Sequence, residues 1–205
     1  MSDNIKTMIN NQLIKRGIID KRVLDAMYSV PRHKFVSRIN RSMAYTDNPL
    51  PIGHGQTISQ PYIVGLMTEL LKVDRNHKVL EIGTGCGYQT AILSILSKKV
   101  ITLEIIKSLS KKSLERLTKF GYKNIDFHCS DGKNGWLREA PYDRILTSAA
   151  PTNIPIALIE QLAPNGCMVI PVGTLHDQFI HIITKDKNEE VHIKKSTPVR
   201  FVPLV

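Results

Sequence analysis

The sequence is poor in cysteine, and its few cysteines do not form a pattern that would cross-link the chain or bind a metal. Cys86, Cys129 and Cys167 are far apart and include no C-x-x-C pair. An odd number of cysteines at such spacings suits neither a disulfide framework nor a structural zinc site. The seven histidines also lack H-E-x-x-H or a similar ligand spacing. We therefore expect a reducing compartment, no disulfide and no metal.

Long apolar runs are missing as well. No stretch approaches the roughly 20 apolar residues of a membrane-spanning helix, and the polar start MSDNIKTMINNQ does not have the basic-then-apolar order of a signal peptide. Hydrophobic residues make up 42% and charged residues 22% of the chain, which is ordinary for a globular protein. These features predict a cytoplasmic protein that makes no membrane contact.

Aromatic residues are scarce at 6%, although the formal net charge is +10. Such a charge suggests nucleic acid as a possible partner. The basic residues, however, occur as separated pairs such as Lys98 with Lys99 and Lys111 with Lys112. No aromatic residues are interleaved to stack on bases, so the pairs resemble solvated ends of helices and strands. We expect no nucleic-acid partner, and we expect a monomer.

The hydrophobic pattern divides the chain at about residue 60 without a linker. Residues 2–16 and 20–29 predict two helices. Residues 31–60 have no regular pattern, and an irregular segment of this length within a compact domain usually has a function. Beyond Pro61, apolar runs alternate with helical patterns. The expected helices cover 61–71, 88–97, 107–120 and 155–162, and the expected strands cover 78–83, 100–105, 125–129, 142–148 and 167–172.

This alternation predicts an α/β fold, a doubly wound and mostly parallel sheet with helices on both faces. The tail departs from it, because 179–184 and 191–204 read as two strands with only a polar turn between them. An antiparallel hairpin at one edge of the sheet explains this most simply. At 205 residues we expect a single domain, in which 1–60 provides N-terminal helices and a loop and 61–205 the sheet.

The turn after the first expected strand carries the clearest chemical signal. It reads Glu81-Ile-Gly83-Thr84-Gly85-Cys-Gly87. Glycines where a strand turns into a helix let the backbone approach a ligand closely, at the edge where doubly wound folds bind cofactors. Dinucleotide-binding folds have G-x-G-x-x-G instead, so the spacing favours a different cofactor.

Acidic residues end the next two expected strands. Glu104 follows Gly83 by about twenty positions, where a carboxylate can accept the hydroxyls of an adenosine ribose. Asp131, followed by Gly132, ends the third strand. A crevice lined by acids disfavours a pyrophosphate and suits a cofactor that carries a sulfonium and an amino group. The alternative is that these acids are ordinary strand-end charges and that the glycines form only a tight turn.

This set of residues resembles the class I S-adenosylmethionine-dependent methyltransferases, whose sheet is Rossmann-like. The resemblance implies S-adenosyl-L-methionine as cofactor and S-adenosyl-L-homocysteine as product. It also implies a cofactor site, formed by Glu81, Gly83, Thr84, Gly85, Gly87, Glu104, Asp131 and Gly132.

The uncharged stretch PIGHGQTISQPY, residues 51–62, narrows the resemblance. Together with 30–36, 79–88, 170–173 and 200–204, it is similar to the protein-L-isoaspartate O-methyltransferase family. This family methylates the free α-carboxylate of L-isoaspartyl residues, and the ester then passes through a succinimide to aspartate. The resemblance implies isoaspartyl proteins as substrates, Ser59 as the catalytic residue, and Gln56 and Thr57 beside it in the cofactor pocket.

The role of Ser59 also follows from the chemistry. A carboxylate is already ionised at pH 7 and needs no general base, so the protein has to supply alignment. A neutral hydroxyl can position the carboxylate without competing for its charge. Ser59 could instead serve as the N-cap of the helix that starts at Pro61. Both interpretations stay open at this point.

Some positions depart from the family pattern. Cys86 stands where serine is common, either as a small filler or as a thiol whose pKa a helix N-terminus lowers. Ile105 replaces a frequent arginine, and Ser130 replaces a common glycine. Two other functions remain as alternatives: an RNA, DNA or small-substrate methyltransferase, and a cofactor-binding protein without catalysis. The segment LTSAAP at 146–151 lacks the N/D-P-P-Y-type motif of base-amino methylation.

Overall fold

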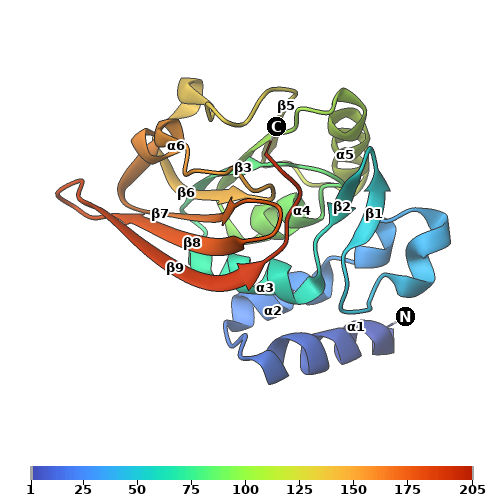
Figure 1. Cartoon of the computed structure of the whole chain (residues 1–205). Helices are drawn as coiled ribbons and strands as arrows, with labels where there is room; N and C mark the ends of the chain where they lie inside the picture. The colour runs from blue at the N-terminus through green and yellow to red at the C-terminus, as the bar shows by residue number, and fades with distance from the viewer. Residues whose placement is uncertain (1, 205) are drawn as a thin grey trace.

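A computed structural model describes residues 2–204. The predicted N-terminal helices are present (Figure 1), and the first changes its helix type twice along its length. It comprises α1 (Ser2–Met8), a π-helical turn η1 (Ile9–Leu13) and a 3-10 turn η2 (Ile14–Arg16). Gly17, with φ of 91°, ends it, and α2 (Lys21–Ser29) follows after Asp20, whose side chain caps it by accepting from the Arg22 amide.

These helices are attached to the rest of the molecule through α3 (Pro61–Leu71). One carboxylate oxygen of Glu69 accepts the backbone N–H groups of Ile19 and Asp20, at 2.8 and 2.6 Å. The Arg16 guanidinium lies 3.4 Å from the centroid of the Tyr62 ring, a close cation–π contact. The N-terminal helices thus pack directly against the helix that begins within the last residues of the uncharged stretch.

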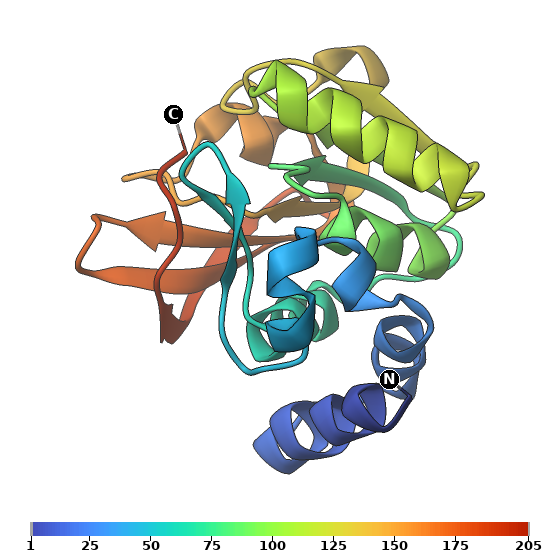
Figure 2. The same ribbon diagram turned by 90° about the vertical axis from the view of Figure 1, so that its right-hand side faces the viewer.

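Residues 31–60 are more ordered than the sequence predicts. They contain two 3-10 turns, η3 (Arg32–Lys34) and η4 (Arg38–Met43), and an antiparallel hairpin of β1 (Leu50–Gly53) and β2 (Gln56–Ile58). His54 at the tip has a positive φ of 55°, between two glycines that also have positive φ. Its Nε2 lies 2.7 Å from the hydroxyl of Ser108, at the start of α5. The hairpin is thereby held at the end of the main sheet where the parallel strands finish (Figure 2).

The main sheet has seven strands in the order β5-β4-β3-β6-β7-β8-β9. Its first five strands pair in parallel, and β7, β8 and β9 pair antiparallel, which confirms the expected sheet and edge hairpin. The strands are β3 (Lys78–Ile82), β4 (Lys99–Leu103), β5 (Ile125–His128), β6 (Tyr142–Thr147), β7 (Leu162–Gly173), β8 (Gln178–Lys185) and β9 (Val191–Val199).

Helices cover both faces of this sheet, with one apolar cluster under each layer. Besides α3, they are α4 (Tyr88–Leu96), α5 (Lys107–Lys119) and α6 (Ile156–Glu160). Val79 packs in the cluster shared with α4 and the N-terminal helices, whereas Leu80 and Ile82 pack in the cluster that includes Leu158 of α6. This alternation follows from the two-residue period of a strand. It also places Glu81 on the same face as Val79.

Two strands differ from their predicted boundaries by about five residues at one end. Strand β7 begins at Leu162 rather than at 167, because Leu162 already pairs with Tyr142 before the register shifts. Strand β9 ends at Val199, and residues 201–204 leave the sheet to run beside Ala150. There the Ala150 N–H donates to Val202 O at 2.8 Å and the Leu204 N–H donates to Ala150 O at 2.9 Å. Within 2–204, no helix is long and apolar enough to cross a membrane.

Candidate active site

A cavity lies at the carboxyl ends of the central strands and has a volume of about 940 Å³, including space open to solvent. Four stretches of chain form most of its wall: 56–59 from the hairpin, 82–86 from the loop after β3, 103–106 from the end of β4, and 201–204 from the C-terminal segment. Figure 2 shows the hairpin standing beside that segment. A cavity at this edge of a doubly wound sheet is where such folds bind their ligands.

The glycine loop after β3 has a backbone that other residues rarely adopt. Gly83, Gly85 and Gly87 have φ values of 90°, 54° and 85°. A Cβ on Gly85 would lie 3.2 Å from the side chain of Ile52, and one on Gly83 would lie 3.4 Å from Ser148 Cβ. The loop therefore needs glycine both for its left-handed backbone and for the close approach of hairpin β1–β2.

The Glu104 carboxylate holds the backbone of this loop by a hydrogen bond. The residue is 6% exposed and lines the cavity. Its Oε2 accepts the Gly85 N–H at 2.7 Å and its Oε1 accepts the Ile106 N–H at 2.9 Å. A carboxylate has about four acceptor sites, so both oxygens keep capacity for a ligand. An anchored carboxylate of this kind suits a vicinal diol.

The predicted site residues fall into two groups. The cavity wall includes Gln56, Thr57, Ser59, Gly83, Thr84, Gly85, Glu104 and Gly132. Three residues lie outside it: Glu81, Gly87 and Asp131. Gly87 is the N-cap of α4, and Asp131 is exposed and accepts the Lys133 N–H at 2.9 Å. At Gly132 a Cβ would come within 2.2 Å of Ile82 Cγ2, so only glycine lets this backbone lie against β3.

Glu81 is fully buried under the loop. Its Oε2 accepts the hydroxyls of Thr90 and Thr102, both at 2.6 Å, whereas its Oε1 is buried without a partner in the described part of the chain. Burial raises the pKa of Glu81 to about 7, although the two hydroxyls act against this and nearby Glu104 adds to it.

Ser59 lies between β2 and α3 and is half-buried. The N-cap residue of α3 is Gln60, which makes no side-chain cap hydrogen bond, so Ser59 is not the N-cap of α3. Its hydroxyl makes no hydrogen bond within residues 2–204. An unpaired hydroxyl in a cavity wall is free to donate to a ligand.

The cavity wall contains a single formally charged side chain among the residues that the structure describes, that of Glu104, and neither lysine nor arginine. Cys86 also lines it but is buried. Burial raises the pKa of the Cys86 thiol. Of the two alternatives, this favours Cys86 as a small buried filler over a thiol with a lowered pKa.

Sequence reasoning did not assign several wall residues to the site. Ser148 lies just after β6, Ser130 just after β5, and Phe201 in the C-terminal segment. The two serines follow β5 and β6, which lie next to β4 and β3 in the sheet. Their position after predicted strands could therefore have assigned them to the cavity. Phe201 was not expected in the wall, since 191–204 reads as one strand.

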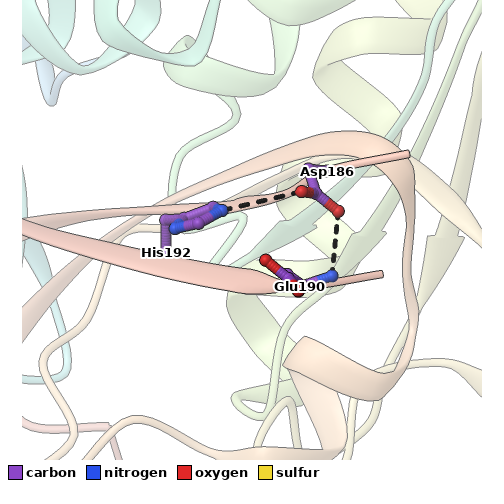
Figure 3. A group of neighbouring side chains, drawn as sticks. All are labelled: Asp186, Glu190 and His192. Atoms are coloured by element: carbon purple, nitrogen blue, oxygen red, sulfur yellow. Dashed lines mark hydrogen bonds and ion pairs between the residues drawn. The ribbon is translucent and has the colours of Figure 1, made fainter. Parts of the chain in front are cut away.

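A cluster of possible metal ligands lies away from this cavity, on the turn between β8 and β9 (Figure 3). It consists of Asp186, Glu190 and His192, whose ligand atoms lie within 4.8 Å of one another. Asp186 Oδ1 already accepts the backbone N–H groups of Asn188 and Glu190, at 2.8 and 2.9 Å. His192 Nε2 is 3.8 Å from Asp186 Oδ2. The turn's own hydrogen bonds thus account for the geometry of Asp186.

Comparison with known proteins agrees with this geometry. The chain is 48% identical over 197 residues to the protein-L-isoaspartate O-methyltransferase of Opitutus terrae, covering 96% of this chain and 84% of the relative. It is also 48% identical over 200 residues to the enzyme of Geobacter metallireducens, covering 98% and 93%.

Among solved structures, the fold matches one assigned as the protein-L-isoaspartate O-methyltransferase of Plasmodium falciparum in complex with S-adenosyl-L-homocysteine. The TM-score is 0.84 at 30% identity, over 98% of this chain and 97% of that one. Residues 3–205 match the family described as protein-L-isoaspartate(D-aspartate) O-methyltransferase. A match over nearly the whole chain, together with these relatives, shows that the chain belongs to the protein-L-isoaspartate(D-aspartate) O-methyltransferase family.

Proposed function

We propose that this chain transfers the methyl group of S-adenosylmethionine to the free α-carboxylate of L-isoaspartyl residues in damaged proteins, and that the resulting ester leads through a succinimide to aspartate. One observation carries the assignment of the site. The unpaired hydroxyl of Ser59 lines the same cavity as Glu104 and the glycine loop. A group that can hold the acceptor thus lies in one space with groups that can hold the donor.

The residues present fit the cofactor. The Glu104 carboxylate, with acceptor sites to spare, would hold the ribose hydroxyls, and the backbone at Gly83, Thr84 and Gly85 would lie along the methionine part. Gln56, Thr57 and Gly132 would complete the wall. When bound, the cofactor supplies an activated methyl group on a sulfonium.

The chain's own contribution is alignment. The Ser59 O–H donates to one oxygen of the substrate carboxylate and leaves the other oxygen free to attack. Since that carboxylate is ionised at neutral pH, no side chain has to remove a proton. Neither lysine nor arginine is among the described wall residues, so no cation pairs with the nucleophile and weakens it. Holding the reactants in line is worth up to about 7–11 kcal/mol in favourable cases.

For the three predicted residues outside the cavity we propose supporting roles. Gly87 starts α4 in the left-handed conformation that turns the loop. Asp131 holds the turn at Lys133, which places Gly132 against the wall. The role of Glu81 depends on its threonine neighbours and is developed in the next subsection.

We further propose that nucleic acid is not the substrate and that the protein acts as a monomer. The wall residues after β6 are Ser148 and Ala149, and they offer no side-chain carboxamide or carboxylate to accept hydrogen bonds from a base amino group. The positive charge is spread over separated pairs along the chain. A carboxylate acceptor therefore suits this cavity better than a base does.

The assignment is tested with a matched pair of peptides that differ only in whether one residue is L-isoaspartyl or L-aspartyl. Incubated with labelled S-adenosylmethionine, the isoaspartyl peptide should be labelled and the aspartyl peptide should not. Total RNA from the same host serves as a third acceptor. Equal labelling of both peptides, or labelling of RNA alone, would contradict the proposal.

A further inference from the structure

A chain of hydroxyl groups connects buried Glu81 to the glycine loop. Glu81 and Thr102 are direct partners on β3 and β4, and the Thr102 hydroxyl donates to Glu81 Oε2 at 2.6 Å. On its other side, Thr102 Oγ1 lies 2.6 Å from Thr84 Oγ1. Thr84 is in the loop, is 4% exposed and lines the cavity. Glu81 therefore reaches the cofactor wall through two side chains.

The direction of these hydrogen bonds follows from the number of protons. An ionised carboxylate can only accept, and each threonine hydroxyl has one hydrogen. Thr102 gives its hydrogen to Glu81, so the hydrogen between the two threonines has to come from Thr84. An ionised Glu81 thus fixes the orientation of the Thr102 hydroxyl and, through it, that of the Thr84 hydroxyl.

Thr90 provides a comparison within the same site. It donates to the same Oε2 of Glu81 at 2.6 Å and is as buried as Thr102. It belongs to α4, however, and no hydrogen bond leads from its hydroxyl to the loop among residues 2–204. The two threonines are equal partners of Glu81, but only Thr102 continues to the cavity.

We propose that Glu81 is a positioning residue for cofactor binding: as a buried acceptor that does not itself line the cavity, it orients Thr84 through Thr102 and so holds the glycine loop in its binding conformation. This inference rests on the proposed cofactor site and is independent of the methyl acceptor. Binding of S-adenosyl-L-homocysteine therefore tests it without any peptide, and a protein that binds none of this ligand would refute the cofactor site itself.

Because Glu81 is buried, the protonation state that stabilises the fold differs from the one that orients the loop. Its Oε1 has no partner in the described chain, and burial raises the pKa of Glu81 to about 7, with Glu104 as the charged neighbour that adds to the effect. An acid whose folded pKa is raised makes the folded state more stable as the pH falls through that value. A proton on Oε2 that is donated to Thr102, however, reverses the chain: Thr102 then donates to Thr84, and the Thr84 hydroxyl has to change its orientation. Folding stability therefore favours the neutral acid, whereas the donating orientation of the Thr84 hydroxyl requires the carboxylate.

The first experiment compares Thr102→Val with Thr90→Val, by calorimetric titration with S-adenosyl-L-homocysteine at pH 8. Both changes remove one hydroxyl partner of Glu81 and preserve shape. We expect Thr102→Val to raise the dissociation constant about 10-fold, because the loss of one hydrogen bond costs this much. Thr90→Val should change it by less than about two-fold, and Thr102→Ser should restore it. Equal losses in both valine variants, or no loss in Thr102→Val, would overturn the proposal.

The second experiment uses Glu81→Gln, which keeps an acceptor oxygen and removes the charge. We expect weaker binding at pH 8, by about 10-fold, together with a melting temperature of the ligand-free protein raised by roughly 2–4 °C. The wild type should bind more weakly at pH 6 than at pH 8, and the variant should show a smaller change. A residue with only a structural role would lower affinity and melting temperature together, and that result, or unchanged affinity, would refute the positioning role.

Discussion

Replacing Ser59 with alanine should lower kcat about 100-fold while the dissociation constant for S-adenosyl-L-homocysteine changes by less than two-fold. The hydroxyl is unpaired within residues 2–204 and lines the cavity, so its loss leaves no protein group unsatisfied. A hydrogen bond to a charged group contributes about 1.5–3 kcal/mol, and misalignment of a nucleophile alone can cost about 100-fold. The effect falls on the reaction and not on the cofactor.

Single-turnover methylation of an isoaspartyl peptide measures the rate, and calorimetry measures the cofactor affinity. Ser42→Ala is the matched control, because it removes a serine hydroxyl from an exposed position that does not line the cavity and should change kcat by less than about three-fold. If Ser59→Ala instead weakens cofactor binding strongly and spares kcat, Ser59 belongs to the cofactor site.

Replacing Glu104 with alanine should raise the dissociation constant for S-adenosyl-L-homocysteine at least about 100-fold. Two losses combine. The ribose hydroxyls lose a charged acceptor, worth about 1.5–3 kcal/mol, and the backbone N–H groups of Gly85 and Ile106 lose the oxygens that hold them. The loop then has to be ordered by the ligand itself, which costs further affinity.

Calorimetric titration at pH 8 checks this expectation. Asp126→Ala serves as the control, since it removes a carboxylate from β5 that pairs with Lys99 and does not line the cavity. It should leave the affinity nearly unchanged. An analogue without the two ribose hydroxyls separates the two losses, because the penalty of Glu104→Ala should shrink with it. An undiminished penalty would leave loop support as the only role of Glu104.

Local patterns made most of the sheet predictable. Apolar runs of strand length alternate with helical periods from residue 61 onward, and each expected element is present within a few residues. The cofactor edge was predictable for the same reason. Residues that follow parallel strands meet at one edge of the sheet, so the sequence pattern predicted that Gly83, Glu104 and Gly132 lie close together. The structure places all three in one cavity wall.

Glu81 shows the limit of that reasoning. It lies within β3 rather than after it, and strand pleating turns it toward the apolar cluster with Val79. The two-residue period of the strand could have shown this, since Leu80 and Ile82 point to the opposite cluster. The presence of an acid near a strand end suggested the crevice, but the position within the pleat decided where its side chain lies.

The remaining differences depend on contacts between distant segments. The hairpin β1–β2 is short, and its strands have little pattern of their own, so its position over the sheet depends on contacts such as His54 with Ser108. Residues 201–204 read as a continuation of a strand, but hydrogen bonds with Ala150 draw them to the cavity. Partners this far apart in sequence leave no local signal in a single chain.

Because the N-terminal helices are attached to α3, a destabilising change in them should also affect the active site. Glu69 and Tyr62 bind the helical segment from α3, the helix that follows Ser59 directly, and one apolar cluster runs from Met8 to Phe201. We propose that 2–204 unfold as one cooperative unit. A destabilising change at the surface of α1 or α2 would then appear in assays as a temperature-sensitive loss of repair, although it lies far from any reacting atom.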